Sequence, residues 1–169
     1  MPDSSTASTL SGEDLQTWAS LATVLEWLPA ALDAQLQRDA ELSHFEYGIL
    51  FALADAADGT LRMSVLAGYA NSSLSRLSRA VARLEAKGWV RRAPDDSDGR
   101  YTLATLTDLG VEKVDEATPG HVRTVRRLVL DPLTQAQARQ LREISRRIMR
   151  AIREDGEWEP SSTRPGSGR

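Results

Sequence analysis

A cluster of serines and arginines between residues 72 and 83 has the side chains best suited to bind an anion. Three serines and three arginines recur at helical intervals: Ser72, Ser73, Ser75, Arg76, Arg79 and Arg83. The apolar residues of the same stretch fall on the opposite face of a helix: Leu74, Leu77, Val81 and Leu84. Hydroxyl and guanidinium groups donate hydrogen bonds to phosphates and base edges, so this division suits a helix in the major groove of DNA. An ordinary surface helix with solvated arginines has the same pattern.

The charge of the chain is unevenly distributed, although the net charge of the 169 residues is only −3. Residues 1–59 contain ten acidic residues and one basic residue, whereas residues 60–107 contain eight basic and four acidic residues, a net charge of +4. Residues 108–169 carry a net charge of +2. The serine and arginine cluster therefore lies in a basic island of an acidic protein, which favours an anionic partner.

Several other kinds of chemistry are excluded by composition. The chain has no cysteine, so disulfides, thiolate catalysis and thiol redox switches are unavailable. Two histidines, His44 and His121, are too few for a protein-only transition-metal site, and we expect no metal and no cofactor. Neither a nucleophile elbow nor a glycine-rich phosphate loop occurs, so an enzyme is a distant third choice. Without a signal sequence or a long apolar run, the chain is expected to be soluble and cytoplasmic, with no membrane contact.

The elements expected around the cluster are mostly helices. Periodic apolar residues predict helices over 11–38, from Ser43 to about residue 58, over 64–70 and over 72–87. Two further helices are expected after residue 107 and after Thr134. Strands are expected over 89–92 and 100–106, joined by a polar tip at 95–99.

Capping residues and prolines mark the expected helix boundaries. Ser43 with Glu46, and Thr134 with Gln137, fit the capping box. Gly88 suits the left-handed residue that ends a helix. Pro29 should bend the first helix, and Pro119 with the following glycine should kink or split the fifth.

Two short helices followed by a β-hairpin predict a winged helix-turn-helix, in a mainly α chain with a small β-hairpin wing. We expect a DNA-binding lobe over 43–107, flanked by long N- and C-terminal dimerisation helices over 10–42 and 108–155. Residues 1–9 and 156–169, which are rich in Ser, Thr, Pro and Gly, are expected to be disordered tails.

Residues 64–107 resemble the core of the MarR family of bacterial transcription regulators. The resemblance rests on Ser73-Leu74-Ser75-Arg76-Leu77, on Lys87-Gly88-Trp89-Val90, on Asp98-Gly99-Arg100 and on Leu106-Thr107-Asp108-Leu109-Gly110. The order of helices over 11–155 also fits. The resemblance implies that Arg100 contacts DNA from the wing while Asp98 orients it or a neighbouring backbone group. Stabilisation of a surface turn is the alternative for both residues. The basic residue that the family often carries within the wing is replaced here by Ser97 and Gly99.

The resemblance further implies a homodimer whose first and last helices interlock. Apolar stripes over Leu15–Leu36 and Leu141–Ile152 support this independently, since a monomer of this size cannot cover them. The family also commonly binds a small aromatic or lipophilic effector between the dimerisation helices and the lobe. The aromatic residues of the corresponding segments are Trp18, Trp27, His44, Phe45 and Tyr47, for which packing in the core is the alternative role.

The sequence therefore predicts a sequence-specific regulator of transcription. We expect it to bind a palindromic or pseudopalindromic operator in double-stranded DNA as a homodimer, with a small-molecule ligand modulating that binding. A winged-helix module that binds an acidic protein is the alternative from another class.

Overall fold

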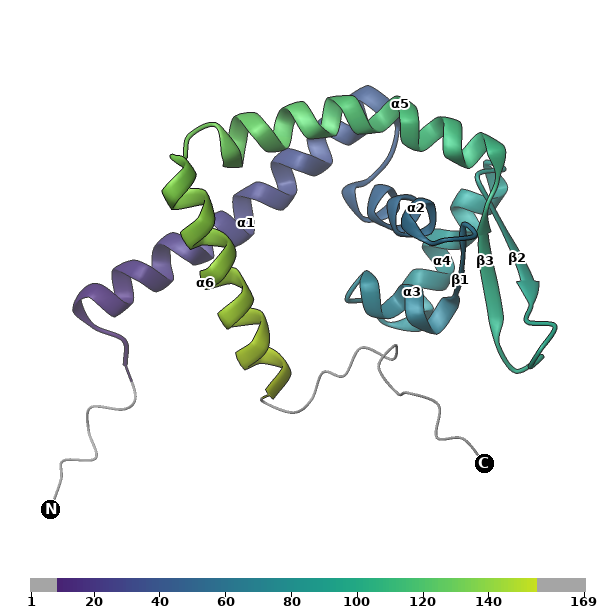
Figure 1. Cartoon of the computed structure of the whole chain (residues 1–169), viewed down its shortest axis with the longest axis horizontal. Helices are drawn as coiled ribbons and strands as arrows, with labels where there is room; N and C mark the ends of the chain where they lie inside the picture. Colours follow the sequence, from purple (N-terminus) through teal and green to yellow (C-terminus); the bar gives the residue numbers. More distant parts are fainter. Residues whose placement is uncertain (1–8, 155–169) are drawn as a thin grey trace, which may run out of the picture.

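A computed structural model of the chain describes residues 9–154. Both predicted disordered tails, 1–9 and 156–169, lie outside the described residues apart from residue 9. The elements are α1 (Gly12–Ala40), α2 (His44–Asp55), β1 (Thr60–Arg62), α3 (Met63–Tyr69), α4 (Leu74–Ala86), β2 (Val90–Pro94), β3 (Thr102–Leu106), α5 (Asp108–Val125), the π-helical turn η1 (Arg126–Leu130) and α6 (Gln135–Glu154). In Figure 1, α5 spans the top of the molecule, the β-hairpin descends from its start and α6 turns back below its far end. The prediction of a mainly helical chain with a winged helix-turn-helix is confirmed.

The sheet has three strands, because β1 joins the predicted hairpin. The strand order is β1-β3-β2, and both pairs are antiparallel. Leu61 pairs with Ala104, and Arg92 pairs with Ala104 from the other side. The strand β1 was not predicted, since three residues are too few to show an alternating pattern. It ties the start of α3 to the base of the wing.

One apolar core lies beneath α2, α3, α4 and the sheet. Its largest fully buried side chains come from the four helices α1–α4, from β2 and from the link between α1 and α2: Leu36, Leu42, Ile49, Leu50, Leu53, Leu66, Leu77, Val81, Leu84 and Val90. Each buried side chain of this size stabilises the fold by about 1.5–3 kcal/mol relative to its exposed state. The core therefore fixes α4 against the sheet through one face, and leaves its other face to solvent.

The helix ends follow the predicted capping chemistry. The Ser43 hydroxyl accepts from the Glu46 amide while the Glu46 carboxylate accepts from the Ser43 amide, which completes the capping box of α2. Thr134 and Gln137 form the same reciprocal pair before α6. Gly88 has φ +76°, which confirms the left-handed residue after α4.

A glycine in the first turn of α5 is required by close packing. A Cβ on Gly110 would fall within contact distance of the Trp89 carbonyl oxygen and of the Leu106 side chain. The Thr107 hydroxyl accepts from the Gly110 amide and donates to the Gly88 carbonyl, so the start of α5 is bound to the end of α4. Any side chain at residue 110 would force these elements apart.

Helix α5 continues through Pro119 as far as Val125, so the proline does not split it. The glycine after it explains the pair. A Cβ on Gly120 would lie 3.1 Å from Gln35 Nε2 and 3.4 Å from Asp39 Oδ2, both on α1. Gly120 therefore lets α1 approach α5 closely, and packing against α1 offsets the hydrogen bond that Pro119 removes from the helix. Helix α1 likewise continues through Pro29.

Long apolar rows on α1 and α6 remain exposed in the single chain. On α1, Leu32 and Leu36 are buried against the lobe, but Leu15, Trp18 and Leu25 nearer the N-terminus are exposed. On α6, the exposed apolar residues are Leu141, Ile144, Ile148, Met149 and Ile152. The N-terminal half of α1 and all of α6 therefore present apolar surface that this chain alone does not cover.

Candidate nucleic-acid interface

Helix α4 begins with a serine cap and turns its polar face away from the core. Ser73 is the N-cap residue, and its hydroxyl accepts from the Arg76 amide. Ser75, Arg76 and Arg79 are exposed, whereas the row beginning at Leu77 is buried. Leu74 departs from the predicted apolar face, since it is exposed at the start of the helix. The first two turns of α4 thus offer hydroxyl and guanidinium donors to a ligand outside the protein.

Arg76 lies over an aromatic ring of α2. Its guanidinium carbon is 4.4 Å from the centroid of the Phe45 ring, which is the geometry of a cation–π contact. Phe45 is partly buried and packs against the core of the lobe. No hydrogen bond or ion pair with another described residue involves the Arg76 side chain, so its N–H donors remain available.

Arg83, two turns further along α4, is tied to α2 although its side chain is 59% exposed. Its Nε donates to Glu46 Oε1 at 2.9 Å, and its Nη1 donates to the Arg79 carbonyl. The Glu46 side chain is only 12% exposed. Burial opposes ionisation of Glu46, but hydrogen bonds from Ser43 and Arg83 outweigh it and keep the pKa of Glu46 below its ordinary value. Arg83 therefore links α4 to the first turn of α2.

At the wing, Asp98 and Arg100 form a two-pronged ion pair. Arg100 Nε and Nη2 donate to Asp98 at 2.9 Å and 2.6 Å, and the Arg100 amide donates to the same carboxylate. These hydrogen bonds lower the pKa of Asp98 and raise that of Arg100. The Arg100 side chain is nevertheless 84% exposed, so Asp98 orients it without covering it.

A network of four residues fixes the base of the wing, and two of them, Arg62 and Tyr101, were not singled out as site residues from the sequence. Arg62 on β1 donates to Asp95 at 2.9 Å, and its guanidinium carbon lies 4.4 Å from the centroid of the Tyr101 ring. Asp95 Oδ1 accepts from the hydroxyl and the amide of Ser97. The Ser97 hydrogen bonds, followed by Arg62, lower the pKa of Asp95 to about 2 despite its burial. The only sequence signal for this network is the polar run at the hairpin tip.

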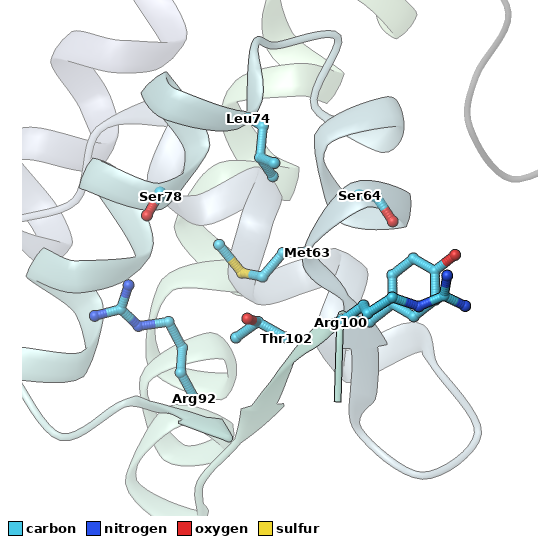
Figure 2. Close-up of a pocket in the computed structure, with 8 residues that line it drawn as sticks. Met63, Ser64, Leu74, Ser78, Arg92, Arg100 and Thr102 are labelled. Atoms are coloured by element: carbon cyan, nitrogen blue, oxygen red, sulfur yellow. The ribbon is translucent and has the colours of Figure 1, made fainter. Parts of the chain in front are cut away.

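A hollow of about 210 Å³ separates α4 from the wing. Figure 2 shows Leu74 and Ser78 of α4 above Met63 at its centre, with Arg92 and Arg100 on opposite sides. Both arginines are paired with a carboxylate, but the Arg92 side chain is only 31% exposed and that of Arg100 is 84% exposed, so Arg100 is the more available of the two. Residues of both α4 and the wing line the hollow, so the two elements border one depression of the surface.

The five aromatic residues predicted to line a ligand pocket do not lie together in the single chain. Trp18 and Trp27 are 52% and 75% exposed on α1. Phe45 lies under Arg76, on the α4 side of α2. Only Tyr47 and His44 lie near each other, and both contact the His121 ring of α5.

A largely apolar cavity of about 400 Å³ lies between α2 and α5. Its lining includes Tyr47, Phe51, Thr118, His121, Val122 and Val125. The Tyr47 hydroxyl and the Thr118 hydroxyl are 3.0 Å apart, and His121 Nδ1 is buried with no hydrogen-bond partner among the described residues. Burial, together with the neighbouring His44, lowers the pKa of His121, so its ring is neutral at pH 7. The cavity thus offers an apolar wall with a few polar atoms.

Within residues 9–154, no group of three or more His, Cys, Asp and Glu side chains is arranged to hold a metal ion. No helix of this part of the chain is both long and apolar enough to cross a membrane.

The chain is similar to MarR regulators in sequence and in structure. A sequence profile described as MarR family matches residues 42–100. The structure of Sco3205, a MarR family transcriptional regulator from Streptomyces coelicolor in complex with DNA, is 45% identical and has a TM-score of 0.82, covering 85% of this chain and 89% of that one. AbsC, a MarR family transcriptional regulator from the same organism, is 32% identical with a TM-score of 0.82, over 86% and 98% of the two chains.

Curated relatives match over a shorter stretch. The uncharacterized HTH-type transcriptional regulator YxaD of Bacillus subtilis is 39% identical over 79 residues, which is 47% of this chain and 54% of that protein. This chain therefore spans about half the length of the curated relatives that it matches.

The Asp95 network predicts how the wing responds to acid. Asp95→Asn should lower the melting temperature near pH 7, because it removes a carboxylate held by Ser97 and Arg62. Since the folded-state pKa is about 2, below the ordinary 3.8, the contribution of Asp95 is present above about pH 4 and is lost as the pH falls toward 2.

Thermal unfolding of wild type and variant from pH 2 to 7 measures this difference. Asp96→Asn is the matched control, since no hydrogen bond or ion pair of the described residues involves that exposed side chain. A difference between wild type and Asp95→Asn that persists undiminished at pH 2 would contradict the assignment.

Proposed function

We propose, because this chain belongs to the MarR family of transcriptional regulators, that it regulates transcription by binding double-stranded DNA at a specific operator. The observation that carries the proposal is the exposed polar face of α4. The buried apolar face of the same helix holds it beside the wing, where Asp98 orients Arg100. The DNA complex of Sco3205, which is 45% identical, supports it. The protein acts by binding in the cytoplasm and is not an enzyme.

In this proposal α4 lies in the major groove. Ser72, Ser73 and Ser75 meet phosphates at the start of the helix, where the helix dipole favours an anion, and Arg76 and Arg79 reach base edges. Arg100 contacts the minor groove or the backbone, and Asp98 holds it in position. Arg83 ties α4 to α2 through its ion pair with Glu46.

Replacement of arginines on α4 should separate specific from general binding. Arg76→Ala or Arg79→Ala is expected to cost about 1–3 kcal/mol of operator affinity and to reduce the ratio of specific to random binding. Arg100→Ala should weaken operator and random DNA alike. Operators selected from a random pool, then titrated by fluorescence anisotropy at several salt concentrations, provide the measurement.

If neither α4 variant changed the ratio of operator affinity to random-DNA affinity, α4 would not be the helix that recognises the operator sequence. Salt-insensitive binding, or no selection of any duplex, would instead favour the alternative of a module that binds an acidic protein.

The exposed apolar rows support a homodimer formed by α1, α5 and α6. Residues 10–42 and 108–155 would form this dimerisation region and residues 43–107 the DNA-binding lobe. A second copy offers the same rows in return, and burying each leucine or isoleucine contributes about 1.5–3 kcal/mol. The two lobes would then read a palindrome with half-sites about 10 bp apart.

Two aspartates on the apolar row of α6 test the dimer. Leu141→Asp together with Ile148→Asp should produce monomers or aggregates and abolish operator binding without changing a DNA-facing residue. Arg139→Asp with Arg146→Asp is the control, since it places the same pair about 200° around the helix, at 3.6 residues per turn. Light scattering gives the mass of each variant. A folded wild-type monomer that still binds its operator tightly would contradict the dimer.

The cavity between α2 and α5 is the proposed effector site. Its apolar wall suits an aromatic or lipophilic molecule, and Thr118 and His121 offer polar atoms to a single hydroxyl. Because Tyr47 and Phe51 belong to α2, a bound molecule would act on the lobe that carries α4.

A cavity-filling variant tests the effector site with 1-naphthol and phenol as probes. In wild type, 1-naphthol should weaken operator affinity about 5- to 150-fold, the usual range of coupling between sites. Val122→Trp should bind the operator normally and lose this response. Val111→Trp is the control, since that valine is equally exposed on the same helix outside the cavity. Equal responses of Val122→Trp and wild type, or no response of wild type to either probe, would exclude the cavity as a site for such compounds.

A further inference from the structure

The three arginines along α4 are held in three different ways. Arg76 lies over the Phe45 ring, Arg83 is tied to Glu46, and the side chain of Arg79 makes no hydrogen bond or ion pair with a described residue. Sequence spacing alone would treat the three as equivalent. Their surroundings therefore assign them different capacities to read a base.

A guanidinium group over an aromatic ring is oriented without using its hydrogen bonds. The attraction comes from the ring quadrupole, so the N–H donors stay free for a bidentate contact with a guanine. Arg83 instead uses its Nε for Glu46 and its Nη1 for the Arg79 carbonyl, so part of its donors are occupied within the protein. Of the three, only Arg76 is both restrained and unoccupied.

The Phe45 ring is a firm support for this contact. Phe45 is the second residue of α2, directly between His44, whose amide donates to Asp33 of α1, and Glu46, which closes the capping box. It packs against the core on one side. On the other it lines a hollow of about 400 Å³ with Asp33, Arg76, Arg79 and Arg83, which leaves Arg76 room to extend.

We propose that Phe45 is a specificity-determining residue that does not touch DNA, because it holds Arg76 in the orientation that reads the operator. The inference rests on the proposed function and deepens it. Because the ring already holds the Arg76 side chain in the free protein, DNA binding removes less rotamer freedom from it. This gain strengthens only the base contact that Arg76 makes, so it favours the operator over random DNA.

Weakening the contact between Phe45 and Arg76 should reduce the preference for the operator over random DNA. A contact of this kind at an exposed site corresponds to about a two- to fivefold change per half-site, and so to about 5- to 30-fold for two half-sites. Phe45→Leu should reduce the ratio of operator to random-DNA affinity by that factor. Phe45→Tyr, which keeps a comparable ring, should retain the wild-type ratio.

A double-mutant cycle isolates the contact from the packing role of Phe45. In the Arg76→Ala background, Phe45→Leu should have no further effect on the ratio. A series with one, two and three ring fluorines at residue 45 keeps the shape while weakening the quadrupole, and the ratio should fall stepwise along it. Melting temperatures are recorded for each protein, and the fluorinated series decides the question where Phe45→Leu is unstable.

The outcomes separate this inference from the proposed function. A wild type that selects an operator, with a fluorinated series of constant ratio, overturns the role of Phe45 and leaves the function intact. An equal loss from Phe45→Leu with and without Arg76 also overturns it, since the residue would then act through packing alone. If the wild-type protein bound all duplex sequences equally, the proposed function itself would be contradicted.

Discussion

The carboxylate of Glu46, whose side chain is only 12% exposed, ties α4 to α2 in addition to the apolar core that the two helices share. It accepts from the amide and the hydroxyl of Ser43, which caps α2, and from the guanidinium of Arg83, which belongs to α4. The two partners lie three and 37 residues away in the chain, so one side chain satisfies a local requirement and a tertiary one together. Neutralising or removing it would free the amide at the start of α2 and leave Arg83 without a counter-charge. The orientation of α4 relative to α2 is therefore bound to the integrity of the cap.

The first turn of α2 joins the two regions discussed above. Phe45 and Glu46 face α4, whereas His44 and Tyr47 contact His121 on α5. A ligand changes an equilibrium only by binding one arrangement better than another. A molecule in the cavity beside Tyr47 would weaken DNA binding if it favoured a position of α2 that differs from the DNA-bound one. Phe45 and Glu46 would then move together with Tyr47, since all three lie in the same helical turn. No longer chain of contacts is required.

The sequence predicted those parts of the fold that depend on neighbours along the chain. Ser43 and Glu46 stand three residues apart, so their spacing predicted the cap. Asp98 and Arg100 stand two apart, and the resemblance to the MarR family implied that Asp98 orients the wing arginine, which fits their ion pair. The contacts that were missed cross the chain. Arg62 meets Asp95 at a separation of 33 residues, and β1 has no pattern of its own. Pro119 and the following glycine predict a kink or a break in the helix, but it is the close approach of α1 that requires the glycine. The same limit hid the contact between Phe45 and Arg76, since nothing in either segment indicates which ring lies beneath which cation.

The division of charge suits this arrangement. The acidic residues Glu13, Asp14 and Glu26 lie on the N-terminal part of α1, which Figure 1 places far from the hairpin. The basic residues of 60–107 lie on α4, on the sheet and, for Lys87 and Arg100, in the segments that follow α4 and β2. A duplex approaching the protein is therefore repelled by the acidic N-terminal part of α1 and attracted to the face that carries Arg76 and Arg100. The arginines of α6 partly offset the repulsion: Arg139, Arg142, Arg146, Arg147, Arg150 and Arg153. Both effects extend about 8 Å at physiological salt, so they orient the encounter before any hydrogen bond forms. A protein with a net charge of −3 can thus bind a polyanion, because residues 60–107, which include α4 and the wing, carry a net charge of +4.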